Sequence, residues 1–387
     1  MGYAFFLDDC DFSALNIGKV TEETVPDPGG DDDTPPVYAV SAETNAALMA
    51  ICYAQEWAEH EDYMTFEEAA AVTDIGTVFS NNSNIGSFDE FQYFTGVTAI
   101  PNNAFVKCTS LTSIVFPQSL QSIGTLAFRY CSNLVAMNFP EATVTVANNA
   151  LQDSGVQVVT LNSNALIAYV TAHSGLFSNA PITTIYLGNR VTDYVLYEGC
   201  VYTADHRTLV YVPSTFQTVT YHPLVETVGA FAMAYTTMSS VTLPSSVTTV
   251  GNSAFINSST LVSVSLPSVT SIGNTAFVYP TASYAKLAQI SMPSVVTIGS
   301  LAFRYFKGTS VDIPSTCTQI GNAFQDSTAI TSMTCRATTP PTIAAQSLSG
   351  WCTGEGKNIY VPAASVDTYK AASVWSNYAS YISAISE

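Results

Sequence analysis

The sequence contains few basic residues and little charge of either sign. Only 11 of its 387 residues are Lys or Arg, against 30 Asp and Glu, and charged residues amount to 11% of the chain. A nucleic-acid-binding protein needs clustered Lys and Arg to neutralise phosphates, so this class is excluded. Hydrophobic residues amount to 47%, which excludes disorder of the whole chain, since disordered chains combine low hydrophobicity with high charge.

Long hydrophobic runs and a signal peptide are also missing. No run of about 18 apolar residues occurs, so no segment is expected to cross a bilayer as a helix. The first residues include no basic region, and the apolar stretch from Tyr3 to Leu7 is too short for a signal peptide. We therefore expect either a protein that is not exported through the general secretory route or one whose signal is missing from this sequence.

Motifs of catalysis and metal binding are absent as well. Eight cysteines in 387 residues are too few for a disulfide scaffold, and the absence of a C-x-x-C pair gives no support to a zinc site or a redox motif. The four histidines are scattered, neither H-E-x-x-H nor G-x-S-x-G occurs, and Lys357 precedes Asn358 where a phosphate-binding loop needs Ser or Thr. We predict a protein that is not an enzyme, with no catalytic residue, no metal site and no cofactor.

An internal repeat is the main feature that the sequence does contain. The motif Ile-Gly-x-x-Ala-Phe and its variants occur eight times, at steps of 22 to 26 residues apart from one gap of 82 residues. This period lies in the range of leucine-rich repeats. The eight copies begin at Ile100, Ile123, Val146, Val228, Val250, Ile272, Ile298 and Ile320.

A second motif lies between the copies of the first. In the stretch from Leu111 to Pro117, LTSIVFP, apolar residues alternate with period two, which predicts a half-buried strand that the proline ends. The glycine of the first motif is expected to supply a turn at low steric cost. The Ala-Phe pair is expected to point inward, so that phenylalanines stack in a column that only neighbouring repeats together can bury.

These motifs resemble the BspA-like family of leucine-rich repeats, which is found mostly in bacterial surface proteins. The family pattern is close to L-x-x-I-x-L-P followed by I-G-x-x-A-F-x-x-C, and the resemblance covers residues 85–387. The segment from Ile359 to Ile385 looks like the family's C-terminal cap. The resemblance implies an α/β-type solenoid, a right-handed leucine-rich-repeat stack with one parallel β-sheet, a small helical N-terminal cap and a C-terminal capping helix. It also implies recognition rather than catalysis.

Cys108 and Cys131 occupy the last position of the family pattern in consecutive repeats. At the spacing of adjacent strands they would lie about 5 Å apart. A disulfide is open to them at that distance, but buried free thiols are favoured, because free cysteine packs as a small hydrophobic residue.

The negative charge is concentrated near the N-terminus. Residues 1–74 hold 17 acidic residues and one basic residue, a net charge of −16, whereas residues 75–387 hold 13 and 10, a net charge of −3. The stretch EETVPDPGGDDDTPP at residues 22–36 is typical of a linker. We divide the chain into an N-terminal anchoring peptide (1–21), an acidic Pro/Gly linker (22–40), a helical N-terminal cap (41–84), the leucine-rich-repeat solenoid (85–358) and a C-terminal cap (359–387).

Two helices around a turn are predicted in the N-terminal cap. Thr65 and Glu68 have the spacing of a capping box at the start of the second helix. Residues 56–67 have the span of a calcium-binding EF-hand loop with Glu67 at its last position, but Glu61 stands where the sharp turn needs glycine. We interpret this segment as a degenerate EF-hand-like loop, with calcium binding as the less favoured alternative.

A ligand-binding face is predicted on the exposed side of the strands. Its residues are the middle ones of each Ile-x-Leu segment, and most are small, neutral and polar. Tyr186 and Tyr211 stand out, because exposed tyrosines are enriched at recognition surfaces; the alternative is that they fill space beneath the irregular stretch between the repeats. The residues singled out for this face are Tyr186, Tyr211, Asn138, Thr160 and Asp312.

These observations predict a non-enzymatic recognition or adhesion protein. Residues 1–21 would anchor it to a larger protein assembly through Phe12, Leu15, Ile17 and Val20, and the solenoid would bind a host-surface glycan or protein. The missing signal favours a virion surface, as in a bacteriophage fibre or capsid appendage. The alternatives are an exported bacterial cell-surface adhesin and a purely structural spacer or scaffold, and assembly with copies of itself stays open. No nucleic acid and no membrane span is expected.

Overall fold

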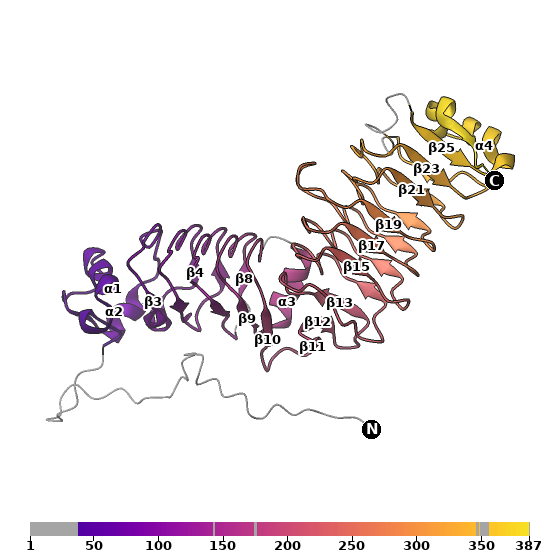
Figure 1. Ribbon diagram of the computed structural model, residues 1–387. Coiled ribbons are helices and arrows are strands. Elements are labelled where there is room, and N and C mark those ends of the chain that lie inside the picture. The colour runs from indigo at the N-terminus through magenta and orange to yellow at the C-terminus, as the bar shows by residue number, and fades with distance from the viewer. Residues whose placement is uncertain (1–37, 142–143, 174–175, 346–347, 349–355, 387) are drawn as a thin grey trace, which may run out of the picture.

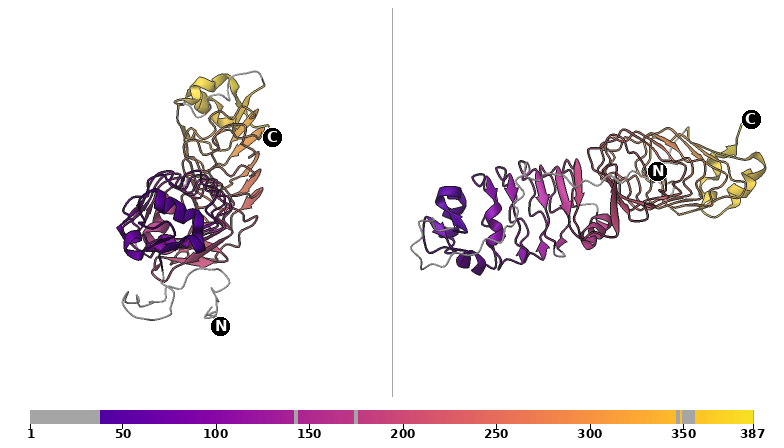
Figure 2. Two further views of the ribbon diagram at one scale, coloured as in Figure 1. Left: turned by 90° about the vertical axis from the view of Figure 1, so that its left-hand side faces the viewer. Right: turned by 90° about the horizontal axis from the view of Figure 1, so that it is seen from below.

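The computed structural model of the protein describes residues 38–141, 144–173, 176–345, 348 and 356–386. These residues form an elongated solenoid whose two arms meet at an angle (Figure 1), and the same arms are seen from one end and from below in Figure 2. We call residues 75–187 the N-terminal arm, residues 188–213 the elbow and residues 214–384 the C-terminal arm. The predicted solenoid of parallel strands with helical caps is confirmed.

Most turns contribute two strands, which lie on two different faces. On one face, which we call the proline face, most strands end shortly before a proline. On the other, which we call the glycine face, most strands end just before the glycine of the repeat. The proline face holds β3 (Ser87–Phe88), β5 (Ser113–Ile114), β7 (Ala136–Asn138), β9 (Val158–Leu161), β10 (Thr184–Leu187), β15 (Ser240–Thr242), β17 (Ser263–Ser265), β19 (Gln289–Ser291), β21 (Ser310–Ile313), β23 (Ser332–Cys335), β25 (Asn358–Val361) and β26 (Ile382–Ala384). The glycine face holds β4 (Ala99–Ile100), β6 (Ser122–Ile123), β8 (Thr145–Val146), β14 (Thr227–Val228), β16 (Thr249–Val250), β18 (Ser271–Ile272), β20 (Thr297–Ile298), β22 (Gln319–Ile320) and β24 (Thr342–Ile343).

The strands pair parallel from turn to turn, but they are distributed over several sheets rather than the one sheet implied by the resemblance. On the proline face the sheets are β3-β5, β7-β9-β10, β15-β17-β19 and β21-β23-β25-β26. On the glycine face β4-β6-β8 form one sheet, and β14 to β24 continue a sheet that begins in the elbow. Separate ladders form on the two faces because each turn runs along two sides of the solenoid.

The predicted column of phenylalanines is confirmed in both arms. Phe105 stacks on Phe128 with ring centroids 5.1 Å apart and planes 5° from parallel, and Phe277 lies in the same way between two neighbours in the C-terminal arm. The column also includes Phe79, which stacks on Phe105 at 5.2 Å. The solenoid therefore reaches into residues 41–84, where the segment from Ile75 to Phe79 is a shortened copy of the repeat.

The glycine of the repeat has a different role from the turn that the sequence predicts. None of these glycines in the C-terminal arm has a positive φ. A Cβ on Gly273 would instead lie 2.5 Å from the backbone nitrogen of Asn252 in the preceding turn. The glycine is thus needed for the close approach of successive turns. The left-handed conformation is taken by the residue before the alanine, such as Asn103 (φ 61°) or Leu301 (φ 59°).

The cysteine position of the repeat holds a buried hydrogen-bond donor. The Cys108 thiol donates to the carbonyl oxygen of Phe79 at 2.9 Å, and the Cys131 thiol donates to that of Phe105 at 3.0 Å. Ser327 takes the same position in the C-terminal arm, and its hydroxyl donates to the carbonyl of Phe303 at 3.2 Å. The favoured reading of Cys108 and Cys131 as buried free thiols is confirmed, and six cysteines of the described residues are free and buried.

These buried thiols are expected to make the protein less stable at alkaline pH. Burial raises the pKa of Cys52 and of Cys200 to about 12, and that of Cys317 to about 11. Above pH 9 the unfolded chain therefore releases protons that the folded chain keeps, so the free energy of unfolding falls as pH rises. We expect the urea midpoint to be flat from about pH 7 to 8 and to fall from about pH 9 to 11. A midpoint independent of pH up to 11 would contradict this expectation, and denaturation at neutral pH should release six further thiols to a thiol reagent.

The elbow contains an antiparallel hairpin that separates two hydrophobic cores. Its two strands are β12 (Cys200–Thr203) and β13 (Thr208–Tyr211). On one side β11 (Tyr194–Tyr197) pairs antiparallel with β12, and on the other β13 pairs parallel with β14. Side chains alternate along these strands: Val201 and Val210 pack in the core of the N-terminal arm, whereas Tyr202 and Leu209 pack in that of the C-terminal arm. The hairpin is thus a wall shared by both cores, and the direction of the solenoid changes there (Figure 1).

The N-terminal cap closes the first turn with two helices. α1 (Ala42–Ala54) begins after a hydrogen bond from Thr44 N to the Ser41 hydroxyl, and β1 (Val40–Ser41) pairs antiparallel with β2 (Tyr63–Met64). α2 (Phe66–Ala71) begins with the predicted capping box of Thr65 and Glu68, which is confirmed. The Asn45 amide donates to the carbonyl of Ser87 at 3.0 Å and so covers the free edge of β3.

The C-terminal cap contains the predicted helix and one more strand. α4 (Val366–Ala371) follows β25, and β26 then returns to pair parallel with β25. Two buried aromatic residues hold the cap against the last turn: the Trp375 indole donates to the carbonyl of Pro341 at 2.7 Å, and the Tyr369 hydroxyl donates to that of Ala337 at 2.9 Å.

Candidate recognition surface

Three of the predicted ligand-binding residues form one row on the proline face of the N-terminal arm. The strands β7, β9 and β10 are in register, so that Asn138 pairs with Thr160 and Thr160 pairs with Tyr186. The residues before them, Met137, Val159 and Ile185, are buried in the core. Because side chains alternate along a strand, the row faces outward. The structure therefore brings Asn138, Thr160 and Tyr186 together as the sequence predicts.

The row is neutral, polar and partly aromatic. Tyr186 is 36% exposed, and it lies on β10, an edge strand of its sheet. The Asn138 side-chain oxygen accepts a hydrogen bond of 3.1 Å from the amide of Asn162, which fixes its orientation. Near the ends of the same strands, Arg190 and Glu141 form an exposed ion pair of 3.1 Å. Such a surface can hold a ligand by hydrogen bonds and ring contact, without strong charge.

Asp312 belongs to a different row, on the proline face of the C-terminal arm. It pairs in register with Thr334, which pairs with Tyr360. The Arg336 guanidinium binds the Asp312 carboxylate with two hydrogen bonds, Nε to Oδ1 at 2.8 Å and Nη2 to Oδ2 at 2.7 Å. This hydrogen bond raises the pKa of Arg336. The charge of Asp312 is thus neutralised by Arg336. The structure does not bring Asp312 together with the row of Tyr186.

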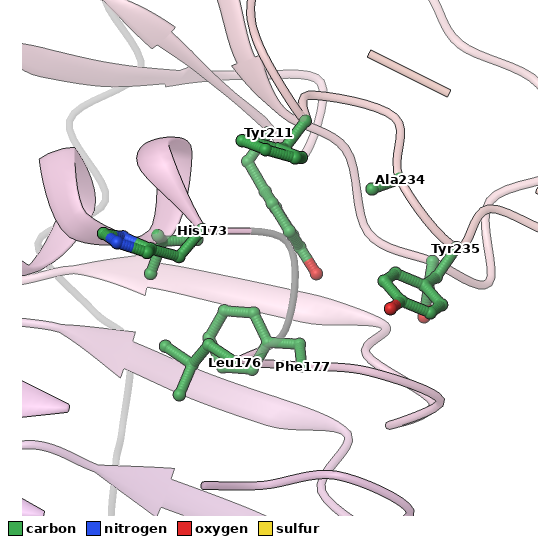
Figure 3. Close-up of a pocket in the computed structure, with 9 residues that line it drawn as sticks. His173, Leu176, Phe177, Tyr211, Ala234 and Tyr235 are labelled. Atoms are coloured by element: carbon green, nitrogen blue, oxygen red, sulfur yellow. The ribbon is translucent and has the colours of Figure 1, made fainter. Parts of the chain in front are cut away.

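The structure corrects the expected place of Tyr211. Its strand β13 pairs with β14 and so continues the glycine face, whereas the sequence was interpreted as a strand of the same face as Tyr186. The Tyr211 ring packs edge-on against Phe177 with centroids 5.7 Å apart, and burial raises its pKa. Figure 3 shows it at a small cavity with His173 and Tyr235. The cavity volume of about 20 Å³ admits one water molecule but no ligand.

Two of the scattered histidines also come together, His206 of the elbow and His222 of the C-terminal arm. The rings of His206 and His222 stack with centroids 4.0 Å apart, and the edge of His222 faces Tyr197 at 4.7 Å. Burial, and to a lesser extent His206, lowers the pKa of His222. The parallel rings fill space beside the hairpin, and no nucleophile or carboxylate is bonded to either ring in the described residues.

The predicted anchoring residues Phe12, Leu15, Ile17 and Val20 lie outside the described residues, as does the linker up to residue 37. The EF-hand-like loop lies within them, between α1 and α2. Among the residues that the structure describes, no group of three or more His, Cys, Asp or Glu side chains could hold a metal ion. Nor is any helix in these ranges long and apolar enough to span a membrane.

A repeated side-chain cluster escaped the sequence-based interpretation. Arg129 lies over the ring of Tyr130 at 4.4 Å and pairs with Asp153 of the next turn at 3.3 Å. Arg304 lies over the ring of Tyr305 at 4.5 Å and pairs with Asp326 of its next turn at 2.7 Å. The sequence contains a signal for this cluster: in each arm the string LAFRY, which holds the Arg-Tyr pair, is followed in the next repeat by QDS, which holds the Asp. Both clusters join successive turns and are half-buried.

Comparison with known proteins places these observations in a family. The model of the BspA type leucine-rich repeat region matches residues 73–203 and 226–353 in six copies. The fold is similar to that of a leucine-rich repeat protein from Eubacterium ventriosum, with 19% identity over 69% of this chain and 70% of the other and a TM-score of 0.45. Among curated proteins no match was found.

Two further solved structures are similar at low identity. One is a leucine-rich cell surface protein from Faecalibacterium prausnitzii, with 20% identity over 78% of this chain and 86% of the other and a TM-score of 0.38. The other is the pneumococcal vaccine antigen PcpA, with 15% identity over 85% of this chain and 86% of the other and a TM-score of 0.40.

Proposed function

The chain belongs to the BspA-type leucine-rich repeat family, and from this premise we propose that it is a recognition protein without catalytic activity. In this proposal it binds a glycan or protein of a host surface through the proline face of the N-terminal arm. The observation that carries the proposal is the row of Asn138, Thr160 and Tyr186, a neutral polar surface with an exposed tyrosine at the edge of a rigid sheet.

The chemistry of this row supports binding over catalysis. An enzyme needs an acid, a base or a nucleophile suited to its reaction, and the row consists of an amide, a hydroxyl and a phenol, with no histidine or carboxylate among its three residues. Tyrosine provides a large contact area at small conformational cost, which suits a recognition surface. The parallel sheet holds the three residues at fixed spacings, so little ordering is needed when a ligand binds.

Display at a surface is part of the proposal. Residues 1–21 would attach the protein to a larger assembly, and residues 22–40 would separate this attachment from the solenoid. Membership of the family supports a bacterial cell surface as the place of display, and nothing in the comparisons supports a virion surface. A structural spacer is the second candidate, which the extended shape of the two arms favours (Figure 1).

The replacement Tyr186→Ser tests the binding face. We expect it to weaken binding of the labelled full-length protein to intact cells or to a glycan array by about tenfold, since the exposed aromatic contact of the row is lost. Tyr284→Ser is the matched control, because Tyr284 is 58% exposed and lies outside the strands of the proline face. Equal binding by the Tyr186→Ser protein and the wild type would contradict the proposed face.

The attachment is tested by comparing the full-length protein with a truncated protein that begins at Pro36. Mass spectrometry of the proteins that co-purify with each would identify the assembly. We expect the truncated protein to lose the envelope or virion proteins that co-purify with the full-length protein, and to keep ligand binding by the solenoid. Recovery of the same partners by both proteins would remove the anchoring role of residues 1–21.

A further inference from the structure

A groove lies over the glycine face of the N-terminal arm, away from the row of Tyr186. It is shallow and largely open to solvent, with a volume of about 550 Å³. The strands β4, β6 and β8 form its floor, and Tyr169 of α3 (Asn164–Ala172) forms a wall. Its ten lining residues include Asn102, Ser122, Thr145 and Tyr169.

The groove exists because α3 replaces a strand. After β9 the chain forms this helix where other turns supply a strand of the glycine face, and the regular turn then resumes with a hydrogen bond of 2.9 Å from Asp153 N to the carbonyl of Ser178. The Ser163 hydroxyl caps the helix by accepting from Leu166 N at 3.2 Å. Leu166 and Val170 are buried against the core, which leaves Tyr169 beside the open ladder.

Main-chain groups of the floor are already used within the solenoid. In register, Ser122 of β6 pairs with Ala99 on one side and with Thr145 on the other, so the backbones of the three strands bond to one another. A ligand in the groove therefore meets side chains: the amide of Asn102, the hydroxyls of Ser122 and Thr145, and the ring of Tyr169. A peptide that adds a strand to a sheet needs an open edge, and α3 packs against β8, the strand at the edge of this sheet.

The lining is also free of charge. None of the ten residues around the groove is acidic or basic, although the chain as a whole has a net charge of −19. An anionic ligand would find no cation in this lining to pair with. The chemistry that fits is a ligand with neutral hydroxyl groups for hydrogen bonds and an apolar face for the tyrosine ring.

The Tyr169 ring is held in position before any ligand arrives. It stacks on the ring of His173, one helical turn away, with centroids 4.1 Å apart and planes 18° from parallel. His173 is fixed in turn by a hydrogen bond of 3.0 Å between its Nδ1 atom and the carbonyl of Tyr169. A pre-positioned ring loses little conformational freedom on binding, which favours affinity.

We propose that this groove is a second binding site, and that its ligand is a neutral oligosaccharide. The apolar C–H face of a sugar unit packs against Tyr169, and its hydroxyls bond to Asn102, Ser122 and Thr145. The site goes beyond the recognition proposed for the proline face, because it lies on another face and uses none of the same residues.

Titration calorimetry of the full-length protein with a panel of neutral and anionic oligosaccharides tests the site. We expect at least one neutral oligosaccharide to bind and the Tyr169→Ala protein to bind it at least about tenfold more weakly, since a stacking contact is lost. Tyr169→Phe keeps the ring and is expected to bind nearly as well as the wild type. Absence of binding across the neutral oligosaccharides, or binding of anionic ones alone, would overturn the proposal.

A pair of arginine replacements separates the groove from general effects on the solenoid. Thr145→Arg places a long side chain in the groove and is expected to abolish binding. Thr342→Arg is the matched control: both threonines are exposed, begin a two-residue strand and donate to the preceding turn at 3.2 Å. Equal thermal stability of the two proteins with loss of binding only in Thr145→Arg supports the site, and equal binding by both overturns it.

The Tyr186→Ser protein completes the comparison. If the oligosaccharide binds in the groove, this protein binds it as the wild type does, whatever happens to recognition by the proline face. Loss of oligosaccharide binding in Tyr186→Ser together with normal binding in Tyr169→Ala would assign the sugar to the proline face and overturn the groove.

Discussion

Replacing Phe277 with alanine is expected to lower the free energy of unfolding by about 4 kcal/mol, since removal of a buried phenylalanine costs both its transfer from water and a cavity. Phe277 is 1% exposed and lies between Phe255, at 4.8 Å, and Phe303, at 5.1 Å, with the three rings almost parallel. The cavity would open at the centre of a column, where rings held by the turns above and below have little freedom to close it. Urea denaturation followed by circular dichroism measures the change.

The variant Phe277→Leu is the control for this prediction. Leu151 takes the same position in the N-terminal arm and is fully buried there, so the solenoid accepts leucine at this level. We expect the leucine variant to lose only about 1 kcal/mol, because most of the volume is kept. An alanine variant that loses no more than the leucine variant would show that the column contributes little to stability.

The second large effect is expected from Gly299→Ala, which should lower the free energy of unfolding by about 3 kcal/mol through overpacking. A Cβ at this position would lie 2.5 Å from the carbonyl carbon of Gly273 and 2.6 Å from the backbone nitrogen of Asn274. Both atoms belong to the backbone of the preceding turn, so no rotation of a side chain can relieve the contact. The two turns would have to move apart, and this would stretch the hydrogen bond of 2.8 Å from Gly299 N to the carbonyl of Ile272.

The N-terminal arm limits how general this prediction is. Ala147 takes the equivalent position there, which shows that one turn can spread enough for a methyl group. In the C-terminal arm the repeat glycines of five successive turns lie above one another, so an increased distance between two turns would also disturb the next turn. These glycines are Gly229, Gly251, Gly273, Gly299 and Gly321.

Gly86→Ala is the control for the glycine prediction. A Cβ on Gly86 would meet no atom within 4 Å, and its φ is not positive. We expect this variant to match the wild type or to be slightly more stable, because alanine restricts the unfolded chain. A Gly299→Ala protein that melts at the same temperature as the Gly86→Ala protein would contradict the close-approach role of the repeat glycine.

The periodic part of the fold was predictable from the sequence, because each repeat imposes the same local rule. Alternation of apolar residues placed the strands, the proline marked their ends, and the Ala-Phe pair predicted the stacked column that Phe105 and Phe128 form. The capping box of Thr65 and Glu68 was equally local. In each case the residues that decide the structure are near one another in the chain.

The elbow was not predictable in the same way, because it depends on contacts between turns that differ from the repeat. The segment from Leu209 to Pro213 has the same pattern as a strand of the proline face, yet the preceding antiparallel strand β12 directs it to the glycine face. Tyr211 is consequently turned toward Phe177 instead of solvent. The row of Asn138, Thr160 and Tyr186 was predictable, because its register follows the repeat on both sides.

The wall formed by β12 and β13 gives the protein a joint that is independent of the length of either arm. Val201 and Tyr202 project from opposite sides of one strand, so the hydrophobic core of each arm ends against this strand. An added repeat would therefore lengthen one arm by the spacing of one strand, about 4.8 Å, and leave the other arm and the angle between them unchanged. By gain or loss of repeats, a lineage can adjust how far each arm extends without having to redesign the bend.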